Sequence, residues 1–208
     1  MDGRSFESPA TFTMNHLQTF WQRLQADDKL VGISEIARRY FAMNAFDGIL
    51  TIIGVLMGNL TAGVSEARIV LATGLSTSVA MGVSGLWGAY LTETAERQRD
   101  LAEMSLHTLT DLRPTRLGRA SRTAVVVVAV VDGISPALAA IIVLLPFIFI
   151  SLLPSIVWAY YVALAFAIIA LFALGIFLGI ISKANWFFYG LKTVVAGLIS
   201  ILISYLIA

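Results

Sequence analysis

Five long apolar stretches alternate with shorter polar segments along the chain. They cover residues 40–62, 69–91, 123–151, 154–181 and 186–208. As a helix, each stretch is long enough to cross about 30 Å of hydrocarbon. The third contains Gly133 and Pro136, where we expect a kink. The pattern therefore predicts an all-α, polytopic membrane protein with five transmembrane helices, formed by residues 40–208.

A shorter periodic pattern precedes the first apolar stretch. Within residues 15–31, apolar side chains recur at helical spacing, at Leu17, Phe20, Trp21 and Leu24. This spacing predicts an amphipathic helix in an N-terminal segment that covers residues 1–39. The helix lies on the membrane surface or packs on the bundle, or it binds a partner. Gly32 is expected to end it, and Ser34 to cap the next helix.

Composition agrees with a membrane protein. The chain is 58% hydrophobic and 13% charged, whereas soluble domains carry about 25% charged residues. The net charge of +1 gives no reason to expect nucleic acid as a partner. There are no cysteines, which excludes disulfides and thiolate metal sites. No basic region followed by an apolar stretch opens the chain, so we expect no cleaved signal peptide.

The distribution of lysine and arginine predicts the orientation in the cell membrane. Bases are frequent in residues 1–39 and in the link 92–122, and Lys183 lies between the fourth and fifth spans. The opposite side carries only Arg68. Because cytosolic loops are enriched in Lys and Arg, we expect a cytosolic N-terminus and an outside C-terminus.

Two aspartates lie inside the apolar stretches, each followed by Gly-Ile. Asp47 is in the first predicted span and Asp132 in the third. A carboxylate at the centre of a bilayer costs about 2.5–3.5 kcal/mol on the insertion scale, so such residues usually mark ion or proton pathways. Pro136 cannot donate to the Asp132 carbonyl, which leaves a second oxygen for a cation. Asp47 and Asp132 are therefore candidate metal ligands, although each could instead hydrogen-bond neighbouring backbone.

Other residues of the spans have a functional and a packing interpretation. Thr51 lies one turn after Asp47, and Met81 in the second span has a thioether that favours softer divalent ions. Together with Asp47, Asp132 and Pro136, these two residues make up the predicted translocation path. Methionines in membranes more often serve packing alone. The Gly54–Gly58 pair of the first span is a packing motif and a candidate homodimer contact.

An acidic stripe follows the second span. Its members share one face of a helix and are Glu93, Glu96, Asp100, Glu103 and His107. The stripe is either a solvated acidic face or a surface that collects cations and binds metal. Carboxylates and imidazole are suitable ligands for Fe²⁺ or Mn²⁺.

Several motifs resemble the vacuolar iron transporter family. Residues 47–55, Asp-Gly-Ile-Leu-Thr-Ile-Ile-Gly-Val, are similar to the first-span signature of that family. Residues 135–140, Ser-Pro-Ala-Leu-Ala-Ala, are similar to the third-span pattern of the family. The last predicted span of this chain, residues 186–208, is similar in its sequence pattern to the last span of the family. Gly85 and Ala89 stand where the family commonly has methionine and glutamate, and Met81 and Asp132 are candidates to replace those ligands.

The resemblance implies a divergent prokaryotic member with a five-span dimeric fold. It further implies proton-coupled antiport of Fe²⁺ or Mn²⁺ out of the cytosol, with Asp47 in the translocation path and the metal as substrate rather than cofactor. A non-transporting membrane scaffold of the same fold is the alternative. An enzyme is not expected, because no Ser/His or His/Glu pair has motif spacing and neither histidine lies in a predicted span.

Overall fold

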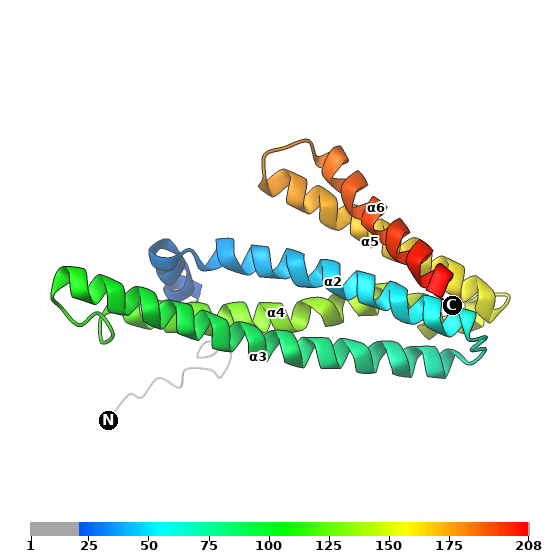
Figure 1. The fold of residues 1–208 in the computed structure, drawn as a ribbon, viewed down its shortest axis with the longest axis horizontal. Helices are drawn as coiled ribbons and strands as arrows, with labels where there is room; N and C mark the ends of the chain where they lie inside the picture. The colour runs from blue at the N-terminus through cyan, green and yellow to red at the C-terminus, as the bar shows by residue number, and fades with distance from the viewer. Residues whose placement is uncertain (1–20, 208) are drawn as a thin grey trace, which may run out of the picture.

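The computed structural model describes residues 21–207 of the chain (Figure 1). The long helices are α2 (Ile33–Thr61), α3 (Ala67–Thr108), α4 (Arg116–Ile148), α5 (Ile156–Ile181) and α6 (Trp186–Ile207). A single 3-10 turn, η1 (Ile150–Leu152), precedes α5, and residues 21–31 are also helical. No strand occurs among residues 21–207. All five long helices are long and apolar enough to cross a membrane, which confirms the predicted all-α, five-span fold.

The helices form a three-helix bundle and a hairpin. α2, α3 and α4 run along the long axis of the molecule, and α3 packs chiefly along α4 (Figure 1). α5 and α6 form a hairpin that diverges from this bundle toward its own turn (Figure 1). The apolar core lies among α2, α4 and α5, where Leu56, Val143 and Leu171 are fully buried. The multi-pass membrane protein is thus built around α2 and α4.

Glycines set the closest helix contacts. A Cβ added to Gly48 of α2 would lie 2.8 Å from the Cα atom of Pro136 in α4. A Cβ on Gly82 of α3 would lie 2.6 Å from the carbonyl oxygen of Gly133 in α4. Backbones can approach this closely only where one residue has no side chain. The two contacts therefore position α2 and α3 against the segment that carries Asp132 and Pro136.

Helix boundaries extend beyond the apolar stretches. α2 begins at Ile33 rather than near residue 40, and α3 continues to Thr108. The link predicted over 92–122 therefore consists mostly of helix, with a short turn before Arg116. α4 is continuous from Arg116 to Ile148, although Pro136 and Pro146 lie inside it.

The junction before α2 differs from the prediction. Gly32 separates the two helices in the left-handed conformation, with φ of 64°, as a break at this position requires. The expected capping by Ser34 is wrong, because the N-cap position of α2 is Gly32 and Ser34 lies inside the helix. Instead, the Ser34 backbone N–H donates to Asp28 Oδ1 at 2.6 Å. Of the predicted amphipathic face, Leu17 and Phe20 lie outside the described residues.

Candidate functional site

Asp132 lies at the meeting point of α2, α3 and α4. Its residue is 4% exposed, and its Oδ1 atom accepts a hydrogen bond from Asn44 Nδ2 of α2. On the other side, a Cβ added to Gly85 of α3 would lie 2.9 Å from Asp132 Oδ2. The carboxylate therefore fills the space that a side chain at position 85 would occupy. One turn farther along α4, Pro136 backs against Gly48, as described above.

A chain of polar contacts connects this carboxylate to the acidic stripe. Asn44 Nδ2 also donates to the Tyr40 carbonyl oxygen at 3.2 Å. The Tyr40 hydroxyl donates to Glu93 Oε1 at 2.9 Å, and Arg97 Nε lies 3.6 Å from Glu93 Oε2. Polar groups from α2 and α3 thus extend from the base of the acidic stripe inward to Asp132.

Asp47 faces a different environment. It is exposed on the outer face of α2, whereas Asn44, one turn earlier, points inward to Asp132. Thr51 is half-buried, and no atom lies within 4 Å of a Cβ built on Gly54 or Gly58. Asp47, Thr51, Gly54 and Gly58 therefore mark a face of α2 that is exposed at Asp47 and Gly58 and only partly covered at Thr51 and Gly54; we call it the outer α2 face.

The two predicted aspartates consequently have separate surroundings within one chain. Asp132 is enclosed by three helices, and Asp47 is open to whatever surrounds the chain. Asn44 relates the two sites, because its side chain contacts Asp132 and it lies one helical turn before Asp47 on α2. Met81 is half-buried on α3, next to the Gly82 contact with Gly133.

The acidic stripe divides into two parts. Glu93 is 9% exposed; it accepts a hydrogen bond from Tyr40 and forms an ion pair with Arg97. The remaining members, Glu96, Asp100, Glu103 and His107, are exposed. Three of these, Asp100, Glu103 and His107, border one open hollow of about 350 Å³ together with Met104. Within residues 21–207, no three His, Asp or Glu side chains converge in an arrangement that could hold a metal ion.

Three residues of this region were not among the predicted site residues: Tyr40, Asn44 and Arg97. Tyr40, Asn44 and Gly48 are spaced four residues apart on α2, so they share the face that meets α3 and α4. This spacing is the sequence signal that could have identified Tyr40 and Asn44 as inward-facing residues. The partners Glu93 and Asp132 lie far away in sequence, and no local pattern connects them to α2.

Comparison with known proteins agrees with this architecture. A profile of the VIT family matches residues 103–208, from the end of α3 through α4, α5 and α6. The chain belongs to the VIT family. An uncharacterized protein of Methanocaldococcus jannaschii is 32% identical over 176 residues, which cover 83% of this chain and 89% of that relative. VIT-family membership is consistent with a membrane metal transporter, and it confirms the family resemblance that the motifs indicated.

Proposed function

We propose that this VIT-family protein is a homodimer that exports Fe²⁺ or Mn²⁺ from the cytosol in exchange for protons. The observation that carries the proposal is the position of Asp47. It lies in a membrane-spanning helix and is exposed on the outer α2 face. A carboxylate facing lipid is costly, so protein or a water-filled cavity must cover it in the membrane.

A second copy of the chain is the covering partner that fits this face best. Gly54 and Gly58 leave a smooth surface on which another helix can approach closely. In a two-fold symmetric dimer the same surface of both copies meets, so two Asp47 carboxylates and two Thr51 hydroxyls would face each other. Such a set of oxygen ligands suits a divalent cation.

Asp132 supplies the second acidic group of the proposed path. Its carboxylate occupies the space beside Gly85, the position where the family commonly has methionine. In this chain a residue of α4 would therefore take over a place that α3 fills in other members. A metal ion can bind only deprotonated carboxylates, so binding releases protons and couples the two fluxes.

The exposed part of the acidic stripe would collect cations before they enter. Glu96, Asp100, Glu103 and His107 extend from the membrane domain on one rigid helix. Their side chains do not converge on a single ion, and so we assign them an electrostatic role. Clustered negative charge raises the local concentration of cations.

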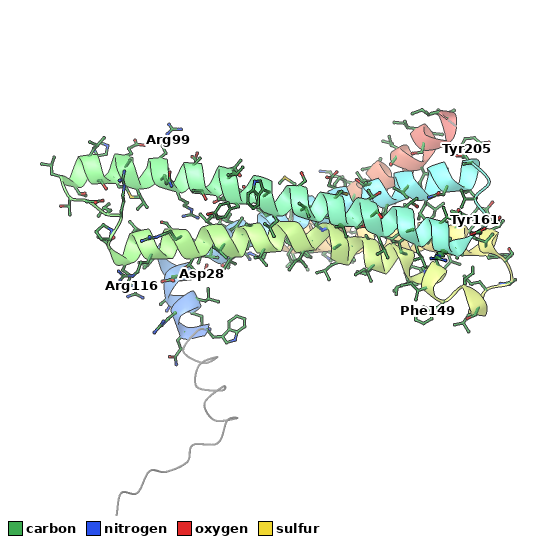
Figure 2. The ribbon with its side chains drawn as sticks, turned by 90° about the horizontal axis from the view of Figure 1, so that it is seen from below. Asp28, Arg99, Arg116, Phe149, Tyr161 and Tyr205 are labelled. Carbon is green, nitrogen blue, oxygen red and sulfur yellow. The ribbon has the colours of Figure 1, made fainter. Side chains whose placement is uncertain are left out.

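The orientation of the molecule determines the direction of transport. Arg99 and Arg116 lie at the same end as Asp28 of the first helix, whereas Phe149, Tyr161 and Tyr205 lie at the opposite end (Figure 2). The excess of basic residues at the first end supports its assignment to the cytosol. The acidic stripe is then cytosolic, and the C-terminus is outside.

Transport in proteoliposomes tests the proposal. Asp47→Asn and Asp132→Asn keep size and polarity but remove the charge and the titrating proton. We expect each variant to abolish the proton flux that Mn²⁺ or Fe²⁺ drives, while the protein still folds. Glu66→Gln is the matched control, because Glu66 is an exposed carboxylate at the start of α3, outside the path. Wild-type flux in both aspartate variants would refute the assignment.

One observation favours the alternative of a membrane scaffold. Asp132 Oδ1 and Glu93 Oε1 already accept hydrogen bonds within the chain, as the oxygens of structural carboxylates do. A scaffold predicts no selective thermal stabilisation by Fe²⁺ or Mn²⁺ over Mg²⁺ in detergent. A transporter with a metal site predicts such stabilisation, and Asp47→Asn should remove it.

A further inference from the structure

A polar cleft separates the first described helix, residues 21–31, from the start of α4. One part of it, about 550 Å³, is lined by Gln22, Arg23, Ala26, Asp27, Arg116, Arg119 and Thr123. An adjoining part of about 370 Å³ adds Lys29 and Leu30. The two parts adjoin each other at Gln22, Ala26 and Arg116, and we call them together the basic cleft.

The cleft carries a strong excess of positive charge. Four basic side chains, Arg23, Lys29, Arg116 and Arg119, line it against the single carboxylate of Asp27. Within residues 21–207 the one ion pair is Arg97–Glu93, so none of the four is neutralised by a described acidic partner. Arg119 Nη1 donates to the Pro114 carbonyl oxygen at 3.0 Å, which holds its guanidinium in place without cancelling its charge.

The cleft also lies at the end of α4 where charged residues give way to the long apolar run. Thr123 lines it and is the first residue of the apolar stretch 123–151. The helix over residues 21–31 runs across the long axis of the bundle, as a helix lying along the membrane surface does (Figure 2). Trp21 and Leu30 on this helix are 61% and 46% exposed, which places apolar surface beside the charges. Such a combination is typical of the headgroup region of a bilayer.

We propose that the basic cleft binds the phosphate headgroup of one anionic phospholipid. Guanidinium groups match phosphate oxygens in a two-pronged geometry, and Arg116 and Arg119 are one helical turn apart on the same side of α4. The lipid would tie the first helix to the transmembrane domain. The site is separate from Asp47 and Asp132, so it stands whether or not the protein transports metal.

Native mass spectrometry of the purified full-length protein in detergent tests the proposal. Phosphatidylglycerol and phosphatidylcholine are titrated separately, and the fraction of protein with one bound lipid is measured. We expect phosphatidylglycerol to bind more tightly. Each arginine near an anionic headgroup changes affinity about fivefold, so Arg116→Gln with Arg119→Gln should weaken binding about 25-fold. Asp27→Asn should strengthen it, which a merely damaged fold would not do.

A matched control separates the cleft from general surface charge. Arg99→Gln with Lys183→Gln also removes two exposed positive charges, but outside the cleft, and should leave lipid binding unchanged. An equal loss in this control would overturn the proposal. Equal binding of both lipids, weaker binding in Asp27→Asn, or displacement of the lipid by inorganic phosphate at similar concentration would overturn it as well.

Discussion

Asp132 loses hydrogen bonds to water when it is buried, and Asn44 donates one hydrogen bond in their place. An acceptor that is buried without a partner costs about 1–3 kcal/mol, and more when it is charged. Asn44→Ala should therefore lower the free energy of unfolding by at least about 1–3 kcal/mol and reduce the melting temperature in detergent.

A second asparagine of the same helix provides the control for Asn44. Asn59 is half-buried and donates to the Val55 carbonyl and to Thr73 Oγ1, but to no carboxylate. Asn59→Ala should therefore have the smaller effect. If the two variants lost equal stability, the bond to Asp132 would have no special role. Combining Asn44→Ala with Asp132→Asn should restore part of the loss, because the stranded charge is gone.

The roles of single residues were only partly predictable from the sequence. Asp47 and Asp132 stand out because charge is rare in apolar stretches, and this signal is local. Their different surroundings were not predictable, because the side of α2 that packs inward depends on contacts with α3 and α4. Likewise, Glu93 belongs by spacing to the exposed acidic stripe, but Tyr40 and Arg97 bind it. Only the folded arrangement brings Tyr40 and Glu93 together.

At the scale of elements, α2 carries one face made for close packing and one that is open. Gly48→Ala would place a Cβ 2.8 Å from the Pro136 Cα atom, and backbone cannot rotate away as a side chain can. We expect this substitution to push α2 and α4 apart and to cost about 1–3 kcal/mol, as overpacking does. Gly54→Ala meets no atom within 4 Å in the same chain.

Thermal unfolding of the two alanine variants checks the contact between α2 and α4. Both substitutions add one methyl group to the same helix, so helix propensity changes equally. The melting temperature should fall for Gly48→Ala and stay at or above that of the wild type for Gly54→Ala in dilute detergent, because alanine favours a helix more than glycine does. Equal melting temperatures would mean that the contact with Pro136 does not limit stability.

Apolar length predicts the membrane elements well, because crossing hydrocarbon demands about 20 apolar residues and little else. The starts of α5 and α6 and the existence of all five spans agree with the sequence pattern. Apolar length does not predict the end of a helix that continues out of the membrane, because polar residues are solvated by water in a helix as readily as in a loop. α3 therefore continues to Thr108, well past the apolar boundary near residue 91.

At the scale of the whole molecule, the proposed dimer can be separated from the fold. Gly54→Leu adds a bulky side chain to the outer α2 face, where a Cβ would meet no atom of the rest of the chain within 4 Å. We expect the variant to fold and to become monomeric, because close helix approach depends on small residues. Sedimentation analysis in detergent measures the change. Gly88→Leu on α3 is the control, since no atom of the chain lies near Gly88 either.

The orientation in the membrane is a second whole-molecule prediction. The chain has no cysteine, so introduced cysteines report without background. Thr110→Cys lies in the turn between α3 and α4, and Ser65→Cys lies in the turn between α2 and α3; both positions are exposed. In intact cells, an impermeant thiol reagent should label position 65 and leave position 110 unlabelled until the cells are opened. The reverse result would invert the topology and the direction of transport with it.

The unbroken length of α3 has a mechanical consequence. From its contact with Asp132 at Gly85 to Glu103, the helix extends by about 27 Å at 1.5 Å per residue. A tilt of about 5° around that contact would therefore move the far end by roughly 2 Å, since a helix behaves as a rod over this length. The continuous helix therefore couples the position of the exposed carboxylates to that of the buried one.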